Sequence, residues 1–140
     1  MPLYANDEAS RELVVDALQQ LVEKGLTSGT SGNVSVLTGD GMLVTPTGVA
    51  PAQLQPEHIV HMALDGEVDE GELSPSSEWR MHADIYAAKP GLEAVVHCHS
   101  NYATILACAH RSIPAQHYMI AASGSYEIPL ADYATFGTQA

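Results

Sequence analysis

Cysteine, positive charge and long apolar runs are all scarce in this 140-residue chain. Two cysteines, Cys98 and Cys108, do not make a disulfide framework, and this usage fits a reducing cytoplasm. Five Lys and Arg residues against 17 Asp and Glu give a net charge of −12, which argues against nucleic acid or an anionic membrane as a partner. No apolar run approaches the length of a membrane span, and the N-terminus lacks the basic and apolar regions of a signal peptide. We therefore expect a cytoplasmic protein.

The composition that is present is globular. Hydrophobic residues make up 46% of the chain, and its length suits one domain over residues 1–140. A small phosphorylated ligand remains compatible with the acidic balance, because backbone N–H groups can hold phosphate without cationic side chains.

Hydrophobic periodicity predicts alternating helices and strands. Helices are expected over about 6–24, within SPSSEWRMHADIYAAKPG with Ser and Pro at its start, and over about 101–109. VSVL and MLVT read as a hairpin, IVHMALDGEV as a strand–turn–strand, and EAVVHCH as a further strand. The segments from 113 onward are strand-like or irregular. This pattern predicts an α/β fold with a mainly antiparallel central sheet flanked by helices.

The strand AVVHCHS carries the first chemical signal. Side chains alternate faces along a strand, so His97 and His99 are expected side by side, with Cys98 turned away as a small buried thiol. Two imidazoles pressed together in a half-buried place are costly unless something bridges them. A divalent metal is the bridge that this pattern favours, and two structural histidines are the alternative.

Three further stretches each give only a weak functional signal when taken alone. In SGTSGNVSV, Ser31 to Asn33 precede a strand and can form a nest of backbone N–H groups, although a simple Gly/Ser loop has the same composition. TPTG, residues 45–48, is turn-like. PSSE places two hydroxyls and Glu78 at a helix N-terminus, where the dipole favours an anion and where ordinary capping is the plainer explanation.

Taken in order, these stretches resemble the class II aldolase/adducin-head family. The resemblance runs through KGLTSGTSGNVSV, DGMLVTPTGV, LSPSSEWRMH, AVVHCHS, RSIPAQHYMIAASG and YATFGTQA. It implies an α/β fold around a mainly antiparallel sheet, assembled as a homotetramer with sites between subunits.

The resemblance also implies roles for individual residues. His97 and His99 match two of the family's zinc-binding histidines, with one Zn²⁺ per subunit. Glu78 matches the carboxylate that ligates the resting metal and then acts as a base. Tyr118 matches a tyrosine that reaches into a neighbouring subunit's site as a proton donor. The positions that match the family's phosphate-binding residues are Gly32, Asn33, Thr47, Gly48, Ser76 and Ser77.

The implied reaction is zinc-dependent cleavage of a ketose 1-phosphate, of the L-fuculose 1-phosphate kind, to dihydroxyacetone phosphate and an aldehyde. Glu78 favours aldol cleavage, because the family's sugar-phosphate 4-epimerases typically have Asp there. A sugar-phosphate epimerase or dehydratase of the same family is one alternative. An inactive fragment, or an adducin-like binding module, is another. The third zinc-binding histidine of the family comes from a His-Gly segment downstream of YATFGT, so we expect this chain, ending at Ala140, to lack the family's C-terminal segment.

The remaining histidines are expected to be structural or exposed. His82 lies one helical turn after Glu78 and could face the site, but packing in the core or at the surface is the stronger expectation. The other four are His58, His61, His110 and His117.

Overall fold

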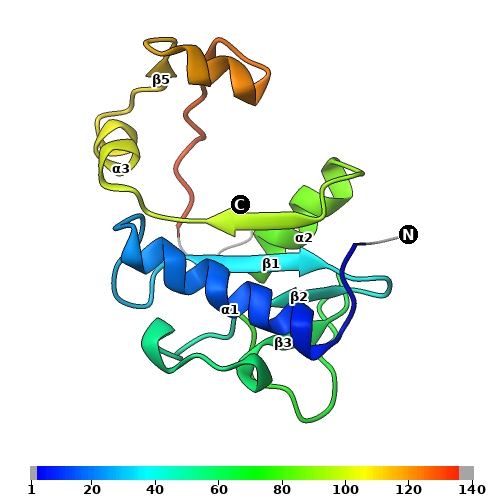
Figure 1. Ribbon diagram of the computed structural model, residues 1–140. Coiled ribbons are helices and arrows are strands. Elements are labelled where there is room, and N and C mark those ends of the chain that lie inside the picture. Colours follow the sequence, from blue (N-terminus) through cyan, green and yellow to red (C-terminus); the bar gives the residue numbers. More distant parts are fainter. Residues whose placement is uncertain (1–2, 136–140) are drawn as a thin grey trace. The chain divides into compact units, whose positions relative to one another are not determined.

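The computed structural model describes residues 3–135 and divides the chain into two compact units, Met1–Cys98 and His99–Ala140 (Figure 1). The ends of the expected 1–140 domain, including the last residues of the YATFGTQA segment, lie outside the described residues.

The first unit is organised around a four-stranded sheet. Its strands are β1 (Asn33–Leu37), β2 (Met42–Val44), β3 (Val60–Met62) and β4 (Ala94–His97), in the spatial order β3-β2-β1-β4. Every neighbouring pair is antiparallel, which confirms the predicted sheet type and the hairpin of β1 with β2. Two short 3₁₀ turns, η1 (Pro51–Gln53) and η2 (Pro56–His58), connect β2 to β3.

Helix α1 (Glu8–Glu23) covers one face of this sheet (Figure 1). It begins where Asp7 accepts a hydrogen bond from the Ser10 N–H, and this capping bond lowers the pKa of the Asp7 carboxyl. Val14 and Leu18 of the helix pack against Val34 and Val36, which alternate toward this face of β1. These residues form the centre of a buried apolar group, here called the α1 cluster.

Helix α2 (Trp79–Ala88) packs on the opposite face. Ala83 and Tyr86 of the helix join a second buried cluster with Met42, Val44 and Val95 of the sheet. The residues of β1 that point to this side are polar at Asn33 and Ser35, and both are buried. Strand β1 therefore presents polar residues to α2, while its Val34 and Val36 face α1.

Three predicted boundaries are wrong. The helix expected to begin at Ser74 and Pro75 begins at Trp79, because Pro75 instead bridges to Pro46 in an extended segment. The strand expected after the Asp65-Gly66 turn is reduced to one bridge between Met62 and Val68. Strand β4 ends at His97, two residues before the end expected at His99.

The second unit contains helix α3 (Asn101–Cys108) and a two-residue antiparallel pair, β5 (Ile113–Pro114) with β6 (Glu127–Ile128). The 3₁₀ segment η3 (Tyr118–Ser123) lies between those two strands in the sequence. Over residues 3–135, none of the helices combines the length and apolar character that crossing a membrane requires.

Candidate functional site

The candidate site lies where β1 begins and β4 ends. Asn33 is the first residue of β1 and lies opposite His97, the last residue of β4, in their antiparallel pairing. Gly32 comes just before, with a φ of +83°, and a Cβ there would stand 3.0 Å from the carbonyl oxygen of His97 and 3.0 Å from Oγ1 of Thr27. Only glycine suits both the backbone angle and the space.

The TPTG turn is fastened to the start of β1. Thr45 is buried, its Oγ1 accepts from the Val34 N–H at 3.2 Å, and its own N–H donates to the Val34 carbonyl at 3.0 Å. The segment before α2 lies against this turn, since the Ser76 N–H donates to the Thr45 carbonyl at 2.9 Å and the Thr47 N–H donates to the Ser74 carbonyl at 3.0 Å.

The predicted phosphate-binding positions therefore lie on three loops at one end of the strands β1 and β2. Asn33 and Ser76 are buried, while Thr47, Gly48 and Ser77 are exposed. Gly48 also has a positive φ, of +76°, in an open turn. Successive turns with hydroxyls and backbone N–H groups at their surface suit an oxyanion, and this chemistry needs no Lys or Arg.

Glu78 occupies the N-cap position of α2, but its side chain does not cap the helix. Its backbone N–H donates to Oγ of Ser76 at 3.3 Å, and its carboxylate turns toward β1 and β4. There Oε2 accepts from Nδ2 of Asn33 at 2.7 Å and lies 3.5 Å from Nε2 of His97. The side chains of Glu78 and His97 are 28% and 24% exposed, so both groups can be reached from solvent.

A buried polar chain continues from Asn33 under α2. Oδ1 of Asn33 is hydrogen-bonded to Nε2 of His82, whose Nδ1 lies 2.7 Å from Oγ of Ser35. The hydroxyl of Tyr86 lies 2.7 Å from the same Oγ. His82 is fully buried, so the expectation of packing in the core is borne out, but the expectation missed these polar contacts.

Burial shifts the pKa of two side chains in this hydrogen-bonded series, His82 and Tyr86. Burial lowers the pKa of His82 to about 4, with a further lowering by the nearby His97 and an opposing effect of the Glu78 carboxylate. Burial likewise raises the pKa of Tyr86 to about 12. His82 is therefore neutral near pH 7, with one ring nitrogen donating and the other accepting.

The donor set at Glu78 and His97 suits a zinc ion. Two ligands bound to one tetrahedral zinc at about 2.0–2.2 Å stand roughly 3.3–3.6 Å apart, and the carboxylate oxygen and imidazole nitrogen here are separated by 3.5 Å. A third ligand is needed to complete such a site. His99 belongs to the second unit and is exposed, and residues 3–135 contain no group of three or more His, Cys, Asp or Glu side chains arranged to hold a metal.

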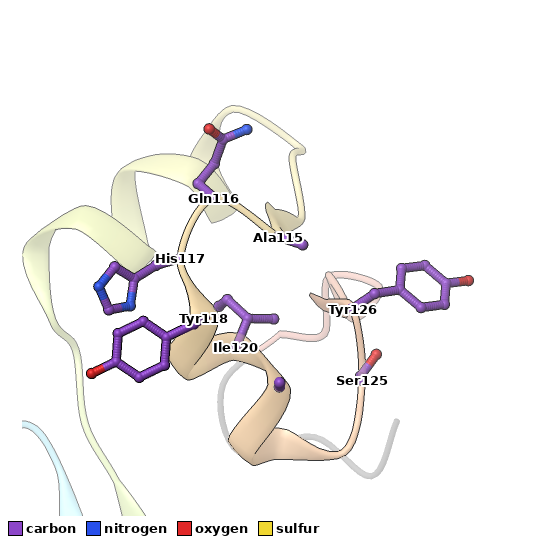
Figure 2. A pocket seen from close by; sticks show the side chains of 8 residues that line it. Ala115, Gln116, His117, Tyr118, Ile120, Ser125 and Tyr126 are labelled. Atoms are coloured by element: carbon purple, nitrogen blue, oxygen red, sulfur yellow. The ribbon is translucent and has the colours of Figure 1, made fainter.

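Tyr118 lies in the second unit, at the first residue of η3, and its side chain is 79% exposed. Its ring lies against that of His117, with a centroid separation of 4.4 Å. Both residues help line a surface pocket together with Ile120 and Tyr126, and Figure 2 shows His117 and Tyr118 on one side of it and Tyr126 on the other. An exposed phenol of this kind is accessible to a molecule that approaches from outside.

The structure also shows the surroundings of Cys98, His61 and His58, for which the sequence predicted no catalytic role. Cys98 is half-buried and packs against the α1 cluster, in agreement with a packing role. His61 is buried and structural, since its Nδ1 lies 2.6 Å from Oδ2 of Asp69 and its Nε2 lies 3.2 Å from Oγ1 of Thr38. His58 is half-buried, and its Nδ1 accepts from the Gln55 N–H in a capping box.

Comparison with known proteins connects this arrangement to one family. Residues 12–140 match the family described as Class II Aldolase and Adducin N-terminal domain. A 5-methylthioribulose-1-phosphate/5-deoxyribulose-1-phosphate aldolase of Rhodospirillum rubrum is 49% identical over 130 residues, which are 93% of this chain and 58% of that protein. The L-fuculose phosphate aldolase of Escherichia coli is 49% identical over 126 residues, covering 90% of this chain and 58% of the enzyme.

Solved structures give the same result. An L-fuculose 1-phosphate aldolase superposes with a TM-score of 0.89 at 39% identity, covering 95% of this chain and 63% of that one. The L-fuculose-1-phosphate aldolase of Thermus thermophilus superposes with a TM-score of 0.75 at 26% identity, covering 94% and 66%. The chain spans less than two thirds of the length of the two sequence relatives and of the first of these structures.

Proposed function

Because the chain belongs to the class II aldolase and adducin N-terminal domain family, we propose that it carries the catalytic carboxylate and phosphate-binding loops of a zinc-dependent aldolase. The substrate is a ketose 1-phosphate, which is cleaved to dihydroxyacetone phosphate and an aldehyde. The names of the relatives give three such sugars, L-fuculose phosphate, 5-methylthioribulose 1-phosphate and 5-deoxyribulose 1-phosphate.

The observation that carries this proposal is the meeting of Glu78, Asn33 and His97. A carboxylate oxygen lies 2.7 Å from an amide donor that belongs to the phosphate-binding segment and 3.5 Å from an imidazole nitrogen that can bind metal. A base, a metal ligand and an oxyanion cradle thus lie within reach of one three-carbon phosphate.

In this proposal the three loops hold the substrate by its phosphate. Backbone N–H groups near Gly32 and Gly48 and the hydroxyls of Thr47, Ser76 and Ser77 donate to the phosphate oxygens. Neutral donors suffice because several act together, and none of these positions is occupied by Lys or Arg. Binding of the phosphate fixes its distance from C3 of the dihydroxyacetone phosphate part and so places the C3 hydrogen next to Glu78.

His97, His99 and Glu78 would hold the zinc ion, with any further ligand from outside the described residues. When bound, the ion supplies Lewis-acid stabilisation of the negative charge that develops on the substrate oxygens.

Proton transfer is assigned to this chain's own side chains. In the condensation direction, the Glu78 carboxylate removes a proton from C3 of dihydroxyacetone phosphate, and the electron pair left there attacks the aldehyde carbon. Tyr118 of the partner subunit gives a proton to the aldehyde oxygen. In cleavage the same groups act in reverse, so Glu78 returns the proton to C3.

The exposed position of Tyr118 supports a role in a neighbour's site, within a homotetramer that has sites between subunits. The two cysteines are unpaired thiols, and this supports a cytoplasmic location.

The experiment is a product assay with zinc-supplemented protein. L-fuculose 1-phosphate and 5-deoxyribulose 1-phosphate are supplied separately, and dihydroxyacetone phosphate is measured in each reaction. Release of dihydroxyacetone phosphate from at least one sugar, lost in Glu78→Gln, is the expected result. Formation of an epimeric sugar phosphate without cleavage contradicts the aldolase assignment, as does the absence of any turnover in a protein that has bound zinc.

A further inference from the structure

Glu78, His82 and Tyr86 lie at four-residue intervals along α2 and contact residues at two-residue intervals along β1. Four helical residues rise about 6 Å and two strand residues about 6.8 Å. The two spacings agree closely enough for each turn of the helix to meet the next inward-facing residue of the strand. Asn33 is therefore contacted by Glu78 and His82, and Ser35 by His82 and Tyr86.

The donor and the acceptor of each of these hydrogen bonds can be assigned by starting from the Glu78 carboxylate. A carboxylate only accepts, so Asn33 must present its NH₂ group to Glu78 and its oxygen to His82. Nε2 of His82 then carries the proton, which leaves Nδ1 to accept from the Ser35 hydroxyl. Since that hydroxyl proton is used, Oγ of Ser35 accepts from the Tyr86 hydroxyl. Each of these side chains is therefore held by a defined donor or acceptor.

We propose that His82 is a positioning residue for the proton transfer, which it serves by holding the Asn33 amide with its NH₂ group against Glu78. This inference rests on the proposed role of Glu78 as the base. The His82 ring is fully buried between α2 and β1, so the substrate cannot reach it. Its effect on the reaction passes through Asn33.

The amide orientation matters because the two ends of Asn33 have opposite polarity. With NH₂ toward Glu78, the amide donates to Oε2 and leaves its second hydrogen for the substrate phosphate. Turned over, the amide places its oxygen against the carboxylate, where two acceptors repel. The Glu78 carboxylate selects the orientation of the amide, and His82 holds it, because its Nε2–H donates to Oδ1 of Asn33 and keeps that oxygen turned away from Glu78.

Two substitutions test the hydrogen bonds at the two ring nitrogens of His82 separately. In His82→Gln the terminal amide can reproduce the donor at Nε2, so the bond to Asn33 can be kept. In His82→Asn the shorter side chain can reproduce the acceptor at Nδ1 for Ser35, but Oδ1 of Asn33 loses its donor. Zinc content, kcat, KM and the exchange of the C3 proton of dihydroxyacetone phosphate with deuterated water are measured for both. We expect kcat and exchange to fall about 10- to 100-fold in His82→Asn with zinc retained, and to stay within about threefold of wild type in His82→Gln.

His61→Asn is the matched control for the loss of a buried histidine. Like His82, His61 is buried and hydrogen-bonded at both ring nitrogens. It lies in β3, however, and its partners Asp69 and Thr38 are not part of the hydrogen-bonded series that begins at Glu78. The variant His61→Asn is expected to lower the melting temperature while leaving kcat and the exchange of the C3 proton unchanged. Equal losses of kcat in His61→Asn and His82→Asn would show a general effect of destabilisation and overturn the proposal, as would a His82→Asn enzyme with wild-type kcat.

A direct measurement keeps the inference separate from the proposed reaction. ¹⁵N NMR of the His82 ring at pH 7 should show a neutral imidazole protonated at Nε2. A proton at Nδ1, or on both nitrogens, overturns the hydrogen-bond chain. If the ring has the expected tautomer and Glu78→Gln nevertheless keeps full C3 exchange, the assignment of Glu78 as the base fails, and the positioning role of His82 in proton transfer fails with it.

Discussion

Asn33 and His97 are paired across β1 and β4, so the amide that contacts Glu78 and the imidazole 3.5 Å from Glu78 are held by one antiparallel ladder. A strand pair is a rigid support, because its backbone hydrogen bonds fix both residues at once. The carboxylate itself comes from the start of α2, on the face of the sheet where β1 is polar. The candidate site thus depends on the packing of one helix on one face of the sheet.

The proposed role of Glu78 as a base can be tested separately from its proposed contact with metal. Glu78→Gln keeps the size of the side chain but cannot take up a proton at neutral pH. We expect kcat to fall about 10²- to 10⁴-fold, because positioned acid–base help is lost. Exchange of the C3 proton of dihydroxyacetone phosphate should fall in parallel, while zinc measured by elemental analysis is retained.

Two results would contradict this prediction in different ways. Loss of zinc from Glu78→Gln makes the carboxylate chiefly a ligand, with the base elsewhere. Retained zinc with wild-type exchange removes Glu78 from proton transfer altogether.

Metal binding should depend on His97 and not on the thiol next to it. His97→Ala removes the imidazole near the Glu78 carboxylate and should release most of the bound zinc, because alanine leaves no donor atom there, whereas Glu78→Gln keeps a side-chain oxygen that can face the ion. Cys98→Ser is the control, since Cys98 packs against the α1 cluster. Equilibrium dialysis followed by elemental analysis measures both. Stoichiometric zinc in His97→Ala, or equal losses in the two variants, would contradict the assignment.

Gly32 and Gly48 make a matched pair for testing the phosphate cradle. Both have positive φ, so an alanine at either costs about 1–2 kcal/mol of backbone strain. At Gly48 the added Cβ meets open space, whereas at Gly32 it stands 3.0 Å from the His97 carbonyl oxygen and from Thr27 Oγ1. Gly32→Ala should therefore lower the free energy of unfolding more than Gly48→Ala, and it should also raise KM for the ketose phosphate.

Urea denaturation and steady-state kinetics on both variants measure these effects. Equal destabilisation by the two alanines would show that Gly32 is not tightly enclosed by Thr27 and His97. An unchanged KM in both variants would show that these loops serve only as turns.

The sequence predicted the sheet, its antiparallel hairpin and the family, because these depend on local periodicity and on short motifs in a fixed order. It did not predict where α2 begins. Pro75 suits the first turn of a helix, but in the fold it pairs with Pro46, and that tertiary contact overrides the local preference. The end of β4 was also predicted too far along the chain, since the strand stops at His97 and not at His99.

The polar chain below Glu78 was also missed, although a signal for it was present. Its links join residues 45 to 51 positions apart in the sequence, such as Asn33 with Glu78 and Ser35 with Tyr86. Polar residues two apart on a strand and four apart on a helix are the pattern that could have revealed it. The pattern becomes specific only once the helix is known to pack on that strand.

Acid should weaken the fold through His82. In the folded protein burial lowers the pKa of His82 to about 4, while the unfolded chain takes up this proton near the ordinary value of 6.5. Between those two values the unfolded state binds more protons, so the free energy of unfolding falls as pH falls from about 6.5 to about 4. The contribution is fully present above about pH 6.5 and is lost through that window, at up to about 1.4 kcal/mol per pH unit for one proton.

The measurement is urea denaturation from about pH 4 to about pH 8, with a chelator present so that the proposed binding of zinc by Glu78 and His97 does not add its own pH dependence. The charged groups that act on His82 are His97 from β4, which lowers its pKa, and Glu78 at the start of α2, which raises it. His82→Gln removes the titrating group and leaves both neighbours in place, so it should flatten the wild-type decline below about pH 6.5. Parallel pH profiles in the two proteins would mean that the buried imidazole takes up its proton at the same pH in the folded and unfolded chains.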